Sequence, residues 1–137
     1  MSSSVLNVTF DCSDAASVAQ FWSDVTRWPC SKQQMPGNTF WVVGAPGGPA
    51  PRLVFVNVPE PKTVKNASIS TWCSTGPQAE ELARLESLGA AVIDDRRLVT
   101  PGGWVVVADP EGNEFDLEGG EESTYRGPGL LRLAGMP

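Results

Sequence analysis

An internal repeat constrains the fold of this chain more than any other feature of its sequence. Cys12-Ser13 in the first half recurs as Cys73-Ser74, and Trp41-Val42-Val43 recurs as Trp104-Val105-Val106. The first pair is offset by 61 residues and the second by 63. A repeat of this kind places one supersecondary unit twice along the chain. The sequence therefore predicts two copies of one small module that differ by a short insertion or deletion.

The length of the chain, 137 residues, fits a single domain with a buried core. Pro59-Glu60-Pro61 lies between the two copies and is too short to separate two domains, so we interpret it as a linker between modules. We predict one domain over residues 1–137. It contains a first module at 4–58, a second module at 66–118, and a tail rich in glycine and charge at 119–137.

The expected strands and helices have the same order in both halves. Alternating apolar and polar residues predict strands, and apolar residues at helical spacing predict helices. In the first half we expect strands at 5–12, 39–44 and 52–58, and a helix from residue 16 that Pro29 ends. In the second half we expect a helix at 76–88 and strands at 67–74, 91–93, 104–108 and 114–117. We interpret both halves as β-α-β-β-β modules, with three strands expected from the pattern in the first half and four in the second, which favours an α+β fold.

Charge and cysteine content argue against several classes of partner. The net charge is −6, from 16 acidic and 10 basic residues, and the longest basic run is Arg96-Arg97. Nucleic-acid binding needs a positive surface, so we expect no nucleic-acid partner. Cys12, Cys30 and Cys73 are odd in number, widely spaced and not in a CxxC pattern, so they indicate neither a disulfide framework nor a zinc site, and we expect them to be buried as small apolar residues.

We expect no membrane association and a cytoplasmic location. No apolar run is long enough to span a bilayer. The start, Met1-Ser2-Ser3-Ser4, has neither the basic flank nor the apolar run of a signal peptide.

Several segments resemble the vicinal oxygen chelate superfamily, which includes glyoxalases and bleomycin-resistance proteins. Residues 102–117, with the turn Asp109-Pro110-Glu111-Gly112-Asn113, look like the closing hairpin of these proteins, and this turn is the most specific element. Residues 10–14 leading to Phe21-Trp22, residues 58–62 and residues 83–90 also resemble the family. Together the segments span residues 5–118, and they are most similar to the short bacterial glyoxalase-like type.

The resemblance implies a fold and an assembly. Each βαβββ module would curl its sheet into half a barrel, and the two halves would enclose a cavity or cleft for a ligand. Members of the superfamily are commonly homodimers, so a homodimer that binds a small molecule is the expectation for this chain.

The resemblance also points to four positions that hold a divalent metal ion in metal-dependent members, usually through His and Glu. Here three of these positions carry Asn7, Val56 and Asp116. The fourth is Ser68 when the repeated cysteines are aligned, or Ser70 when it is counted back from the second helix. The chain has no histidine, and transition metals prefer imidazole, thiolate or several carboxylates. We therefore expect no metal ion and no other cofactor.

Other side chains are expected to line the cavity around these positions. Strand alternation puts Thr9 and Asp11 on the face of Asn7, and Trp72 on the face of Ser68 and Ser70. The tryptophans that face the barrel would stack on a flat or cationic ligand, with core packing as the alternative. The predicted ligand-binding residues are Asn7, Thr9, Asp11, Trp41, Val56, Ser68, Ser70, Trp72, Trp104, Glu114 and Asp116.

Asp116 is the candidate catalytic residue. It has three possible roles: a structural hydrogen bond to Asn7 or a backbone amide, contact with a ligand, or general acid/base work, which a half-buried carboxylate of raised pKa suits.

Two main functions follow from these assignments. The first is a protein that sequesters a small planar, aromatic or cationic metabolite or antibiotic, as metal-free resistance members of the superfamily do. The second is a metal-independent isomerase, lyase or cyclase whose acid/base groups are Asp116, Asp11 and Glu114. A metal-dependent lyase or dioxygenase is a third, less favoured hypothesis.

Overall fold

The computed structural model describes residues 1–98 and 103–119. All but the first residue of the predicted tail at 119–137 therefore lies outside the described residues. The chain divides into two compact units, Met1–Val64 and Lys65–Pro137, and each unit is described by itself.

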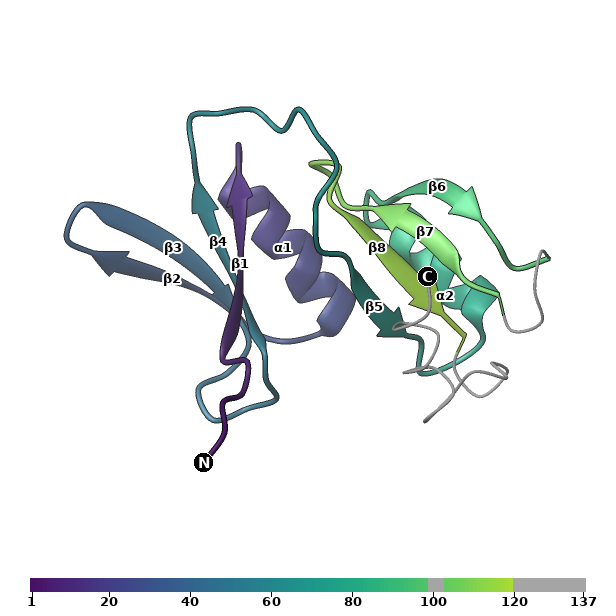
Figure 1. The fold of residues 1–137 in the computed structure, drawn as a ribbon, viewed down its shortest axis with the longest axis horizontal. Helices are drawn as coiled ribbons and strands as arrows, with labels where there is room; N and C mark the ends of the chain where they lie inside the picture. The colour runs from purple at the N-terminus through teal and green to yellow at the C-terminus, as the bar shows by residue number, and fades with distance from the viewer. Residues whose placement is uncertain (99–102, 120–137) are drawn as a thin grey trace. The chain divides into compact units, whose positions relative to one another are not determined.

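The first unit is a four-stranded mixed sheet with one helix (Figure 1). The sheet order is β1-β4-β3-β2, in which β1 pairs with β4 in parallel and the other neighbours are antiparallel. The elements in chain order are β1 (Asn7–Cys12), α1 (Ala15–Thr26), β2 (Cys30–Met35), β3 (Asn38–Val43) and β4 (Arg52–Asn57).

Helix α1 begins where two side chains accept hydrogen bonds from its first backbone amides. Asp14 Oδ1 accepts from the amide of Ser17 at 3.2 Å, as an N-cap residue does. Asn57 at the end of β4 accepts from the amide of Ala15 at 2.7 Å, which ties the helix start to the sheet. The helix ends at Arg27, whose φ of 58° is in the left-handed region.

The core of the first unit lies between α1 and one face of the sheet. Phe10 stacks on Phe55 with 5.0 Å between ring centroids and on Trp22 of the helix with 6.2 Å. Phe55 and Val43 are fully buried. Because strand residues alternate between faces, this core fixes which side chains of each strand face the helix. We call the sheet face of Phe55 the helix-side face and the other one the far face.

Strand β2 has no counterpart among the strands expected from periodicity. Its sequence, Cys-Ser-Lys-Gln-Gln-Met, lacks alternating apolar residues. It lies at the edge of the sheet, where it pairs with β3 alone, so most of its side chains remain in solvent. A strand with little to bury leaves no apolar pattern, although the βαβββ module requires a strand at this place.

The second unit repeats the arrangement of the first (Figure 1). The sheet order is β5-β8-β7-β6, with β5 parallel to β8 and antiparallel pairing elsewhere. The elements in chain order are β5 (Ser70–Cys73), α2 (Gln78–Ser87), β6 (Ala91–Asp95), β7 (Val105–Ala108) and β8 (Glu114–Glu118).

The core of the second unit combines α2 with one face of its sheet. Phe115 and Leu117 of β8, and Val105 and Val107 of β7, are at most 2% exposed. Leu82 and Leu85 supply the buried face of α2, and α2 contacts β8. By analogy with the first unit, the face of Phe115 is the helix-side face and the other one is the far face.

The structure confirms the predicted α+β class with two βαβββ modules. Neither four-stranded sheet closes on itself within residues 1–98 and 103–119, so a curled barrel or cleft formed by both modules stays a prediction. No helix of the described part of the chain is long and apolar enough to cross a membrane. The expectation that all three cysteines are buried is wrong for Cys73, which is exposed, and only partly right for Cys30.

Replacing Phe55 with alanine is expected to lower the free energy of unfolding by about 3–5 kcal/mol, because the change leaves a cavity between β4 and α1. Val54→Ala, one residue away on the far face, is expected to cost about 1 kcal/mol. Urea denaturation of both variants measures the difference. Equal losses would show that the core does not lie on the face of Phe55.

Candidate ligand-binding site

The far face of the first sheet carries most of the predicted site residues of this unit. Asn7, Thr9 and Asp11 alternate along β1, and Asp11 is aligned with Val56 of β4. Val56 is aligned in turn with Phe40 of β3. The register therefore brings the four predicted residues of β1 and β4 onto one face, opposite Phe55.

This far face combines partly exposed apolar side chains with short polar ones. Phe40, Val54 and Val56 are half-buried, and Asn7, Thr9 and Asp11 are exposed. Val56 of β4 occupies one of the four positions that hold the metal ion in metal-dependent members. This face therefore offers an apolar surface rather than a set of metal-binding donors.

Trp41 lies on the opposite face from these residues, which corrects the expectation that it faces the same cavity. It is aligned with Phe55, so it belongs to the helix-side face of β3. Lys32 of the neighbouring strand lies over its ring, with Nζ 5.7 Å from the ring centroid. This contact occupies a face of the indole that a ligand would otherwise stack on.

Three carboxylates share the far face of the second sheet. Glu114, Asp116 and Glu118 occupy alternate positions of β8, whereas Phe115 and Leu117 between them are buried in the core. Thr71 of β5 is aligned with Asp116, and Cys73 is aligned with Glu118. The structure thus brings the predicted Glu114 and Asp116 together and adds Glu118, which the sequence analysis missed.

The sequence analysis placed Ser68, Ser70 and Trp72 on the face that lines the site with Asp116, and for Ser70 and Trp72 this expectation is wrong. Ser70 is aligned with Phe115 and Trp72 with Leu117, both on the helix-side face. Trp72 Nε1 donates a hydrogen bond to Ser70 Oγ at 2.9 Å, and Ser68 precedes β5 as an exposed residue.

The physical reason for this error is a shift of one residue in the alignment of the two halves. Phe55 of β4 and Phe115 of β8 are both buried on the helix-side face and lie 60 residues apart, whereas the cysteine repeat is offset by 61. A shift of one residue moves every side chain of a strand to the other face.

Of the three carboxylates on this far face, only Glu114 forms an ion pair among the described residues. Lys65 Nζ lies 3.2 Å from Glu114 Oε1. Burial raises the pKa of Asp116, Lys65 lowers it and Glu114 raises it further. Burial and the charge of Asp116 both raise the pKa of Glu118, which is 4% exposed. Glu118 Oε2 and Glu114 Oε1 are buried and have no hydrogen-bond partner among the described residues, but Glu114 Oε1 has the charge of Lys65 Nζ beside it.

Trp104 lies directly before β7, at the same end of the sheet as Glu118. Val105 is aligned with Leu117, so continuing the register by one residue places Trp104 opposite Glu118. Trp104 is half-buried, and its carbonyl accepts a hydrogen bond from the amide of Arg96 at 2.8 Å. The predicted aromatic residue therefore lies beside the carboxylate that the prediction omitted.

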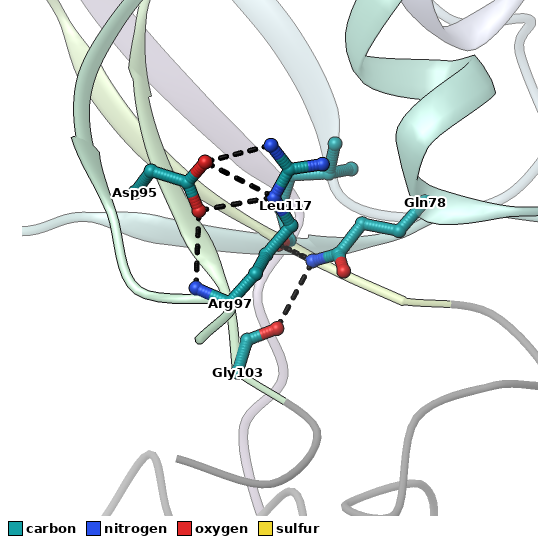
Figure 2. A network of polar contacts seen from close by, with 5 residues as sticks. All are labelled: Gln78, Asp95, Arg97, Gly103 and Leu117. Carbon is teal, nitrogen blue, oxygen red and sulfur yellow. Dashed lines mark hydrogen bonds and ion pairs between the residues drawn. The ribbon is translucent and has the colours of Figure 1, made fainter. Parts of the chain in front are cut away.

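Gln78, the first residue of α2, holds this end of the sheet together (Figure 2). Its side-chain amide donates to the carbonyl of Leu117 at 3.0 Å and to that of Gly103 at 3.1 Å. These carbonyls belong to the residues just before Glu118 and Trp104. Gln78 thereby fixes the backbone from which both side chains project, with the Asp95–Arg97 ion pair close by in Figure 2.

The opposite end of β8 is fixed by a buried polar turn. Asp109 Oδ1 accepts from the amides of Glu111 and Asn113, each at 2.9 Å. Asn113 Oδ1 accepts from Asn66 Nδ2 at 3.0 Å, which attaches the segment before β5 to the turn. The turn sets the register of β7 with β8, and hence the face on which the carboxylates lie.

The residues present do not fit the divalent metal ion that the fold family implies. Within residues 1–98 and 103–119, no group of three or more His, Cys, Asp or Glu side chains is placed to hold a metal ion. Asn7 and Val56 supply one amide and one hydrocarbon at the corresponding positions. The donors therefore lack the imidazole, thiolate or converging carboxylates that such an ion prefers.

The raised pKa of Glu118 predicts how its replacement changes stability with pH. Unfolding returns this pKa toward its ordinary value of 4.5, so above that value the folded state binds more protons and stability falls as the pH rises. Glu118→Gln is therefore expected to unfold at higher urea concentration than the parent protein at neutral pH. The difference is expected to disappear below pH 4.5.

Glu60→Gln, which changes an exposed carboxylate in a loop, is the control for the loss of one charge. A Glu118→Gln variant that is less stable than the parent at neutral pH would contradict the account.

Solved structures of several bacterial proteins have a similar fold. The fosfomycin resistance protein FosX from Mesorhizobium loti is 15% identical, with a TM-score of 0.67 over 98% of this chain and 99% of that one. TnmS3, an antibiotic binding protein from Streptomyces sp. CB03234, is 23% identical, with a TM-score of 0.64 over 87% and 97%. A glyoxylase/bleomycin resistance protein/dioxygenase domain from Frankia sp. EAN1pec is 16% identical, with a TM-score of 0.62 over 91% and 97%.

At these identities the solved structures establish similarity of fold alone. No match to the sequence was found among curated proteins. The family of glyoxalase-like domains matches residues 7–118, which include every described strand and both described helices. The chain is therefore a member of the glyoxalase-like domain family.

Proposed function

We propose that this protein binds a small planar, aromatic or cationic organic molecule on the far face of one of its sheets, without a metal ion. The observation that carries the proposal is the negative charge on the far face of the second sheet. There Asp116 and Glu118 have no ion-pair partner among the described residues, and the described side chains form no metal site. Negative charge without converging ligands suits an organic cation better than a metal ion.

The far face of the first sheet supports the planar part of the proposal. Phe40, Val54 and Val56 are half-buried apolar side chains on a face that α1 does not cover. Partly exposed apolar groups of this kind stabilise a flat ligand through the area that they remove from water. In this proposal Asn7, Thr9 and Asp11 orient such a ligand by hydrogen bonds.

Proteins with this fold provide a precedent for binding. TnmS3, which has this fold, is an antibiotic binding protein. Noncovalent capture of an antibiotic or metabolite is therefore consistent with the fold, and the charge of the present chain favours a cationic compound. We further propose that the protein acts as a homodimer, as the family resemblance implies.

A metal-independent enzyme is the alternative, and the environment of Asp116 favours it. Burial raises the pKa of this half-buried carboxyl, which brings it closer to the range in which a general base works near neutral pH. In that case Asp116 would take a proton from a bound substrate, and Asn in its place would abolish turnover. Binding without turnover would leave sequestration as the function.

Quenching of tryptophan fluorescence by a panel of planar aromatic compounds tests the binding function. A cationic member of the panel is expected to saturate the signal, and Trp104→Phe is expected to weaken its binding several-fold because the larger indole surface is lost. Trp28→Phe, at the end of α1, is the matched control. Equal effects of the two variants, or no saturation by any compound, would contradict the proposal.

Elemental analysis of purified protein tests the metal-free part separately. Less than one divalent ion per ten chains is expected, on the order of what weak adventitious sites retain. Binding of the fluorescent compound should survive dialysis against a chelator. One tightly bound metal ion per chain would contradict the proposal that the protein acts without a metal ion.

A further inference from the structure

The carboxylates of β8 are spaced along the strand rather than gathered at a point. Alternate residues of a strand lie about 6.6 Å apart, measured along the chain. Among the described residues, no group of three or more His, Cys, Asp or Glu side chains is placed to hold a metal ion, so this row does not form a metal site. Glu114 already has Lys65 Nζ at 3.2 Å. Asp116 and Glu118 form no ion pair among the described residues, although the charge of Lys65 also acts on Asp116.

Glu118 provides an independent sign that a positive group belongs at this place. The residue is 4% exposed, yet its Oε2 has no hydrogen-bond partner among the described residues. A buried carboxylate without a partner destabilises the fold unless it is protonated or meets a donor. The backbone around it is well fixed, because its carbonyl accepts hydrogen bonds from the amide and the hydroxyl of Ser74. A positive ligand would satisfy the unpartnered oxygen without a change in the backbone.

The neighbours of Glu118 are of the kinds that surround a bound organic cation. Continuing the register of β7 with β8 by one residue beyond Val105 places Trp104 opposite Glu118, and β5 aligns Cys73 with Glu118 on the other side. The face of an indole attracts ammonium and guanidinium groups. Because Cys73 is exposed, this part of the face is open to solvent on the β5 side.

We infer that the far face of the second sheet recognises an extended organic cation with two positively charged nitrogens. One nitrogen pairs with Glu118 beside Trp104, and the other pairs with Asp116 one strand repeat away. Lys65 pairs with Glu114, so two of the three carboxylates remain for positive charges of the ligand. This inference rests on the proposed binding function, and it specifies the class of ligand within it.

Calorimetric titration with a series of simple amines tests the inference. Putrescine, cadaverine and spermidine are the probes with two or more charges, and butylamine is the probe with one. The diamines are expected to bind at least about tenfold more tightly than butylamine. Glu118→Gln and Asp116→Asn are each expected to weaken diamine binding about tenfold and to leave butylamine binding much less affected.

Glu86→Gln is the matched control, since it removes the same charge from an exposed position of α2. It is expected to leave diamine binding unchanged. Equal affinities for diamines and butylamine, or equal effects of Glu86→Gln and Glu118→Gln, would overturn the inference. If planar neutral compounds quench tryptophan fluorescence while no diamine binds, the proposed function stands and the inference fails. If neither kind of compound binds, both fail.

Cys73 offers a second readout that needs no ligand. In a Cys30→Ser background, a methanethiosulfonate reagent that carries a trimethylammonium group should modify Cys73 faster than the analogue that carries a sulfonate. Glu118→Gln should reduce this preference, because Cys73 is aligned with Glu118. Equal rates for the two reagents, or a preference that the variant does not change, would overturn the inference. Circular dichroism of the variants confirms that they are folded.

Discussion

The position of strand β8 between β5 and β7 determines most of what the second unit can do. Phe115 and Leu117 are buried in the core with the leucines of α2. Because side chains alternate along a strand, burying these two residues turns Glu114, Asp116 and Glu118 to the other face. The row of carboxylates is therefore a consequence of core packing, and a one-residue shift of β8 would exchange the core for the charges.

Burial of the apolar side chains of β8 stabilises the fold, whereas burial of the Glu118 carboxylate opposes it. Burial of two large apolar side chains stabilises the strand by about 1.5–3 kcal/mol each. The same placement leaves Glu118 4% exposed with an unpartnered oxygen, which opposes folding. Gln78 and the Asp109 turn fix the two ends of β8 through hydrogen bonds to its backbone and to the hairpin. The backbone that carries the carboxylates is thus fixed before any ligand arrives, which lowers the entropic cost of binding.

Much of the fold was predictable from the sequence, and the exceptions have physical causes. Apolar alternation identified the strands that bury one face, and the helices followed from the spacing of their apolar residues. Strand β2 was missed because an edge strand exposed on most of its length buries too little to leave a pattern. The curled barrel depends on how the two modules meet and stays a prediction.

The candidate site was only partly predictable, because it depends on register. Asp116 and Glu114 were identified, but the alignment through the repeated cysteines was one residue from the register of β5 with β8. Ser68 was assigned from this alignment and Ser70 from a count back from the second helix, and Trp72 was placed on the same face as both. Trp41 was assigned to the ligand cavity, whereas it lies on the helix-side face. Glu118 was overlooked although it continues the alternation of Glu114 and Asp116. Its burial is a property of the folded unit, which periodicity alone does not reveal.

Carbon-13 NMR of the side-chain carboxyl groups tests the central claim most directly, because it observes Asp116 and Glu118 themselves. Addition of putrescine at neutral pH is expected to shift the carboxyl signals of these two residues. The signal of Glu114, already paired with Lys65, should shift less, and that of Glu60 should stay unchanged. Saturable shifts confined to Asp116 and Glu118 are the predicted result. Unchanged signals at both residues, or shifts of equal size at every carboxylate of the chain, would contradict the account.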